Sequence, residues 1–207
     1  MLKIWGRTTS SNVMKVLWAC AELGVSYERI DWGGEFGGNR NPDYLAMNPN
    51  AVVPTIDDGG FVLWESNAIV RYLAAKHGKG GLAPADSRTH ADADRWMDWQ
   101  QTTLGPAFSP IFAGLVRTPP EKRDMAAIDA AVARTQGLLG MLDARLATRP
   151  FVAGGELTIG DIPFGPTVHR WFSLPIARSP LPHLEAWYKR VLTRSGYRTH
   201  IADIPVS

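Results

Sequence analysis

Every segment with the composition of a β-strand lies before residue 80 of this 207-residue chain. These segments are short and apolar or alternating, and the last two flank an Asp-Asp-Gly-Gly sequence typical of a hairpin turn. They comprise residues 2–4, 26–30, 52–56 and 61–64. Apolar residues at spacings of three and four predict helices over 13–23 and 66–78. The resulting order of strand, helix, strand, irregular segment, hairpin and helix predicts an α/β unit.

The rest of the chain has the pattern of helices alone. A long helix is expected over 88–116, kinked because Pro106 and Pro110 each lack a backbone N–H. An alanine-rich helix is expected over 121–147. Shorter helices are expected to begin near three further positions: Thr158, Leu181 and Ser195.

The change from a mixed to a purely helical pattern indicates two domains. Residues 1–78 would form the α/β domain and residues 88–207 an all-α helical bundle. Residues 79–87, which are rich in glycine at their start, would form the linker.

Composition argues against several classes of function. The net charge is only +2, and Lys and Arg are scattered among acids, so neither nucleic acid nor an anionic membrane is an expected partner. No apolar run approaches the roughly 20 residues of a membrane span. The five histidines have no metal-ligand spacing, and no metal is expected. The single cysteine, Cys20, lies on the apolar stripe of the first helix; we expect it in the core, and the cytoplasm as the compartment.

Three local features carry chemical information, and the first is Thr9-Ser10-Ser11-Asn12, between the first strand and the first helix. Ser and Asn there could simply cap the helix. A helix N-terminus also attracts a thiolate or another anion through its dipole and free N–H groups.

The second feature is Pro54 within a strand-like run. Proline is normally confined to the edge or start of a strand. A cis bond between Val53 and Pro54 at the start of the strand would leave the Val53 backbone free to pair with an extended peptide ligand. An ordinary edge-strand proline is the alternative.

The third feature is Glu65-Ser66, at the start of the helix that follows the hairpin. It could again be a cap. It could equally hold a ligand that carries both a carboxylate and an amine. The Ser66 hydroxyl and N–H would bind the carboxylate, and Glu65 would accept from the amine.

Together these features resemble the cytosolic glutathione S-transferase family, especially its bacterial, theta-like and nu-like, serine-type members. The resemblance extends over essentially the whole chain. In the helical half it includes a capping box in which Asp161 would reach back to Thr158 and Leu157 would contact Ile162. The segments that carry the resemblance are residues 10–16, 48–56, 63–69 and 157–162.

The resemblance implies a thioredoxin-like N-terminal domain that binds glutathione as co-substrate. Ser10 would donate a hydrogen bond to the glutathione sulfur, and Asn12 would assist it. Val52 is also expected at the glutathione site, but relatives often carry a polar residue at its position. Arg40 is therefore the candidate partner for the glycyl carboxylate. The other residues expected to bind glutathione are Ser11, Val53, Pro54, Glu65 and Ser66.

The resemblance also implies a second-substrate pocket for a hydrophobic electrophile, supplied mainly by the helical domain. A homodimer is expected, with Trp96 and Trp99 either at a two-fold interface or inside the bundle. Glutathione conjugation, a role in detoxification, is the expected activity; glutathione-dependent disulfide reductase or peroxidase chemistry and non-catalytic ligand binding are the alternatives. The candidate pocket residues are Thr9, Phe108, Phe112 and Trp171.

Overall fold

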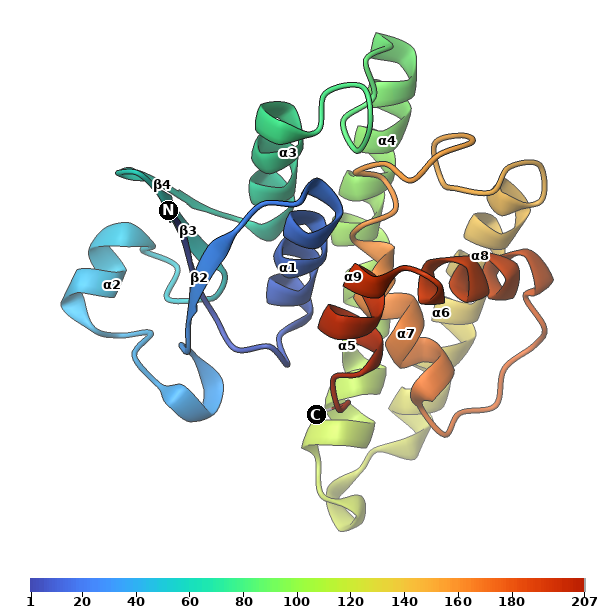
Figure 1. Ribbon diagram of the computed structural model, residues 1–207. Coiled ribbons are helices and arrows are strands. Elements are labelled where there is room, and N and C mark those ends of the chain that lie inside the picture. Colours follow the sequence, from blue (N-terminus) through green and yellow to red (C-terminus); the bar gives the residue numbers. More distant parts are fainter. Residues whose placement is uncertain (207) are drawn as a thin grey trace.

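The computed structural model of the protein describes residues 1–206. An α/β unit with a four-stranded sheet lies beside a set of helices, and α1 and α3 lie between the sheet and those helices (Figure 1). The expected fold class, a thioredoxin-like unit followed by an all-helical one, is confirmed. The α/β unit comprises β1 (Leu2–Trp5), α1 (Ser11–Leu23), β2 (Tyr27–Ile30), α2 (Pro42–Met47), β3 (Thr55–Asp58), β4 (Phe61–Trp64) and α3 (Ser66–His77).

The sheet has the strand order β2-β1-β3-β4. β1 pairs in parallel with β2 and antiparallel with β3, and β3 and β4 form the predicted hairpin. Ile4 of β1 lies opposite Ile56 of β3, and both are fully buried. Because alternate residues of a strand face the same side, Leu2 joins Ile4 in the core under α1.

α1 is buried on two faces and so connects the two units. Leu17 and Cys20 belong to the core beneath the sheet, whereas Met14 and Trp18 belong to the core of the helical unit. Cys20 is fully buried as predicted, and burial raises the pKa of its thiol to about 12. The side chain is therefore a core residue and not a nucleophile.

The helical unit begins after a short connection, and its first helical stretch runs without a break from residue 87 to 117, close to the predicted 88–116. The stretch widens into two π-helical segments, one directly before the turn that contains Pro106, which supplies no N–H to the helical ladder. The helices of this unit are α4 (Ser87–Trp99), α5 (Gly105–Phe112), α6 (Met125–Leu146), α7 (Phe164–Ser173), α8 (Pro182–Leu192) and α9 (Ser195–Tyr197); the π-helical segments are Gln100–Leu104, Ala113–Arg117 and Arg198–Ala202.

Three sequence-based expectations need correction. The helix expected near Thr158 begins only at Phe164, because the Thr158–Asp161 hydrogen bonds close a turn and Pro163 precedes the first helical residue. The helix expected from residue 121 begins at Met125, where the Asp124 side chain accepts from the Ala127 N–H.

The third correction concerns the segment expected to be irregular, which contains α2. Asn41 caps this helix through the Asp43 N–H, and Pro42 is its first residue.

Trp96 and Trp99 pack on each other and on Phe164, inside the helical unit. No helix among residues 1–206 is long and apolar enough to cross a membrane.

Candidate active site

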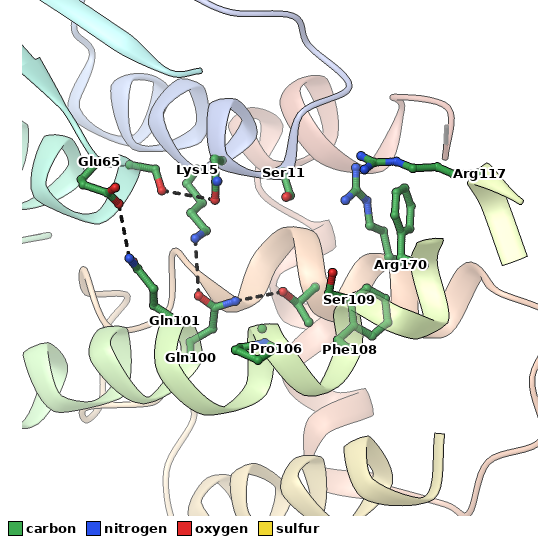
Figure 2. A pocket seen from close by; sticks show the side chains of 15 residues that line it. Ser11, Lys15, Glu65, Gln100, Gln101, Pro106, Phe108, Ser109, Arg117 and Arg170 are labelled. Carbon is green, nitrogen blue, oxygen red and sulfur yellow. Dashed lines mark hydrogen bonds between the residues drawn. The ribbon is translucent and has the colours of Figure 1, made fainter. Parts of the chain in front are cut away.

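A cavity of about 480 Å³ lies between the two units (Figure 2). α1 and the start of α3 lie on one side, and the π-helical segment Gln100–Leu104, α5 and α7 lie on the other. Its walls carry more polar than apolar side chains. The residues that line it are Ser11, Asn12, Lys15, Glu65, Ser66, Gln100, Gln101, Gly105, Pro106, Phe108, Ser109, Phe112, Arg117, Thr167 and Arg170.

The N-terminus of α1 lies at this cavity. Ser10 is the N-cap residue by backbone conformation, with φ −77° and ψ 121°, yet its side chain makes no capping hydrogen bond. Its hydroxyl is therefore not used for capping. Ser11 and Asn12, the first two residues of the helix, line the cavity.

The start of α3 faces the same space. Ser66 is buried, and its hydroxyl donates to Oδ1 of Asn12 at 3.3 Å, which joins the two helix N-termini. Glu65 precedes the helix with φ 71°, an uncommon conformation for a residue with a side chain and one often held at functional sites. Its carboxylate accepts from Nε2 of Gln101 at 3.3 Å.

The loop before β3 has the predicted cis bond between Val53 and Pro54. Two side chains hold the loop by donating to the Val52 carbonyl oxygen: the Tyr44 hydroxyl at 2.7 Å and the Asn48 amide at 2.8 Å. Val53 contributes no backbone hydrogen bond within residues 1–206, so its N–H and C=O are free to pair with a ligand.

Lys15 is a buried cation at the floor of the site, and sequence reasoning missed it. Its ammonium donates to Oε1 of Gln100 at 3.4 Å, and Gln100 in turn donates to the Thr167 hydroxyl at 3.2 Å. Burial lowers the pKa of Lys15 to about 8, and the negative charge of Glu65 opposes that shift. One feature of the sequence could have indicated a buried lysine: Lys15 stands in a helix whose other core residues are apolar.

Arg170 is a second buried cation that sequence reasoning missed. Its guanidinium donates to the carbonyl oxygen of Thr9 at 2.8 Å and lies 4.0 Å from the centre of the Phe112 ring. Arg117 lies 5.1 Å from the same ring centre. Burial, then the positive charges of Arg117 and Arg7, lower the pKa of Arg170 to about 10, so the side chain stays charged at neutral pH.

The cavity brings together six of the sequence-predicted residues and leaves the others, including Ser10, Val53 and Pro54, outside its lining. Trp171 is fully buried in the helical core, Arg40 is exposed on the surface, and Val52 is half exposed on the loop before β3. Thr9 is also outside the lining, and its carbonyl oxygen accepts from Arg170, which lines the cavity. The six in the lining are Ser11, Asn12, Glu65, Ser66, Phe108 and Phe112. No group of three His, Cys, Asp or Glu side chains within residues 1–206 is arranged to hold a metal ion.

Comparisons with known proteins agree with this geometry. Residues 1–75 match the family described as the glutathione S-transferase N-terminal domain, and residues 125–190 match its C-terminal domain. The chain is 45% identical to glutathione S-transferase GstB of Escherichia coli (strain K12), over 100% of both chains, and 31% identical to glutathione S-transferase 4 of Zea mays, over 99% of this chain and 94% of that one. A theta class glutathione S-transferase from Xanthomonas axonopodis pv. citri, solved with glutathione bound, superposes with a TM-score of 0.96 at 48% identity, over 100% of this chain and 99% of that one.

Proposed function

This chain belongs to the glutathione S-transferase family, and from that premise we propose that it activates glutathione as a thiolate and joins the sulfur to an electrophile with an apolar body. The thiol proton leaves to solvent when glutathione binds. The thiolate then attacks the electrophilic carbon, a C–S bond forms, and the leaving group, chloride in an aryl chloride, departs with the electron pair of its bond.

One observation carries this proposal: the N-termini of α1 and α3 converge on one cavity, linked by the 3.3 Å contact between Asn12 and Ser66. Glutathione is a tripeptide with a charged γ-glutamyl end and a thiol, and it would need one helix N-terminus for each of these two groups. Glu65 and Ser66 would hold the γ-glutamyl end, and the Val53 backbone would pair with the cysteinyl residue. The sulfur would then lie by the N-terminus of α1.

Thiolate formation needs no general base at this site. A free thiol has a pKa near ~8.5, and lowering it by about two pH units takes roughly 2.7 kcal/mol. One hydroxyl donor to a charged acceptor contributes about 1.5–3 kcal/mol, and a helix N-terminus up to about 1 kcal/mol more. We assign the hydroxyl to Ser10, assisted by Asn12. Arg170 adds positive charge next to Thr9, the residue before Ser10.

The wider setting of the activity is part of the proposal. We propose domain boundaries of 1–78 and 88–207, joined by 79–87, and a homodimer as the working form. A buried, single Cys20 is compatible with the reducing cytoplasm as its compartment and with detoxification as its role. Phe108 and Phe112, whose side chains line the cavity, would contact the apolar part of the electrophile.

An ultraviolet titration of bound glutathione tests the mechanism by following thiolate absorbance against pH. We expect a midpoint about two pH units below that of free glutathione. Ser10→Ala should raise the midpoint by about one pH unit or more, and by more than Ser11→Ala does. An unshifted midpoint in the unsubstituted protein would reject thiolate activation.

Two substrates separate the competing activities: an aryl chloride for conjugation and hydroxyethyl disulfide for reduction. We expect conjugation of the aryl chloride to be the faster reaction. Faster turnover of the disulfide would favour the reductase alternative. Tight glutathione binding with neither activity would favour a binding protein.

A further inference from the structure

The electrophile end of the cavity is strongly cationic. Figure 2 shows Arg117 and Arg170 together at the end of the cavity opposite Glu65. The ion pairs formed within residues 1–206 include neither arginine. Arg170 is only 7% exposed, so it is a desolvated cation with no counter-ion among residues 1–206. Burying an unpaired charge is costly, and an anion bound at this end would offset the cost.

The surroundings of Arg170 bring further positive charge to this end. The positive charges of Arg117 and Arg7 both lower the pKa of Arg170. Among residues 1–206, the one carboxylate paired with Arg7 is that of Glu35, 4.0 Å away. The Phe112 ring contacts the guanidinium groups of Arg117 and Arg170. An aromatic ring in contact with two guanidinium groups is a surface for a ligand that combines an apolar body with a negative charge.

We infer that the preferred electrophiles of this enzyme carry a carboxylate, which Arg170 and Arg117 bind while Phe108 and Phe112 contact the apolar body. The inference rests on the proposed function and narrows its substrate class. Glutathione would occupy the Glu65 and Ser66 end, so its sulfur would meet the electrophile between the two ends. The carboxylate takes no part in bond making and fixes the orientation of the electrophilic carbon.

A matched substrate pair tests this inference: 4-chloro-3,5-dinitrobenzoate and its methyl ester, which share the reacting carbon and the leaving chloride. The thiolate sulfur forms the C–S bond, and chloride leaves with the electron pair of the C–Cl bond, in both. The readout is the ratio of kcat/KM for the acid to kcat/KM for the ester. We expect the ratio to fall by about 10- to 100-fold in Arg170→Met and to fall in Arg117→Met as well.

Two further variants make the result specific. Arg170→Lys keeps a positive charge and should restore part of the ratio. Arg134→Met removes an equal charge from an exposed position on α6 and should leave the ratio unchanged. Arg117 is exposed, and its side chain makes no hydrogen bond within residues 1–206. Arg117→Met therefore gives a readout even if Arg170→Met fails to fold.

The outcomes distinguish this inference from the proposed function. If the unsubstituted enzyme conjugates neither substrate, the proposed function fails. If it conjugates both and the arginine variants leave the ratio unchanged, the function stands and the inference is overturned. A higher KM for glutathione with an unchanged ratio would also overturn it, because the arginines would then serve the glycyl carboxylate.

Discussion

Lys15 makes a pH-dependent contribution to folding stability that one substitution isolates. Its pKa is about 8 in the folded protein, against 10.5 for an exposed lysine, so the folded state holds the proton less tightly than the unfolded state does. The contribution of Lys15 to the free energy of unfolding is therefore largest above pH 10.5 and is lost as the pH falls through 8. Relative to Lys15→Met, the unsubstituted protein should gain at most about 3 kcal/mol between pH 7 and pH 10.

Urea unfolding of both proteins at several pH values measures this difference. The contributions of groups that titrate in both proteins cancel in the difference between the two unfolding free energies. Lys122→Met, at an exposed position, is the control and should follow the unsubstituted protein across the range. Parallel profiles for Lys15→Met and the unsubstituted protein would show that Lys15 is solvated in solution.

At the same scale, the sequence predicted the cavity-lining residues at the two helix starts better than the two buried cations of the cavity, Lys15 and Arg170. Asn12, Glu65 and Ser66 sit in local patterns at helix starts, and local patterns are what a sequence displays. Lys15 and Arg170 became site residues only because helices 155 residues apart in the chain pack against one cavity. Contacts between residues far apart in the chain do not change the local spacing of residue types, so the sequence analysis missed these cations.

The turn before α7 depends on one buried carboxylate. Asp161 accepts from the N–H of Val152 at 2.9 Å, the N–H of Thr158 at 3.0 Å and the indole N–H of Trp187 at 2.9 Å. Asp161→Ala would leave these three donors buried without acceptors, at about 1–3 kcal/mol each. We therefore expect Asp161→Ala to lose at least about 3 kcal/mol of unfolding free energy.

Asp161→Asn is the matched variant, because it keeps the shape and one acceptor oxygen. Denaturant unfolding at pH 7.5, above the raised pKa of about 6 that burial gives this carboxyl, should rank Asp161→Asn between the unsubstituted protein and Asp161→Ala. Equal stability of all three would mean that water satisfies the donors.

Helices with a long apolar pattern were predictable in type and nearly in extent, whereas the helix starts at Met125 and Phe164, which depend on a cap or a preceding turn, were not. The 3.6-residue pattern predicted α1 and α3, because each buries a continuous face. α2 was missed because it is six residues long and buries only Tyr44, too little for a periodic pattern. Its Asn-Pro start was the readable signal.

Over the whole molecule, the two sequence-level units share a core. Met14, Trp18, Val70 and Ala74 come from α1 and α3, yet they belong to the hydrophobic cluster of the helical unit. The change from a mixed to a purely helical pattern predicted two units but not the shared core. Both faces of α1 are apolar, and the sequence does not show which unit packs against which face. A shared core predicts that the two units unfold together.

Gly165→Ala tests this shared core. A Cβ at Gly165 would lie 2.7 Å from Cζ3 of Trp18 and 3.0 Å from Cδ1 of Ile201, so the side chains that join the units must move apart. Such overpacking costs about 1–3 kcal/mol. Gly137→Ala, in an open position on α6, should instead stabilise the protein by up to about 1 kcal/mol through helix propensity.

Thermal unfolding followed by far-ultraviolet circular dichroism and by tryptophan fluorescence checks both the direction and the coupling. Fluorescence reports on the packing around the eight tryptophans of both units, including Trp18, which packs edge to face on Tyr197 at the junction with ring centres 4.9 Å apart. Circular dichroism reports on all helices. We expect coincident transitions by both probes in all three proteins, at a lower temperature for Gly165→Ala and a higher one for Gly137→Ala. If Gly165→Ala lowered only the fluorescence transition and left the helical transition in place, the units would separate before they unfold, and the shared core would contribute contact without cooperativity.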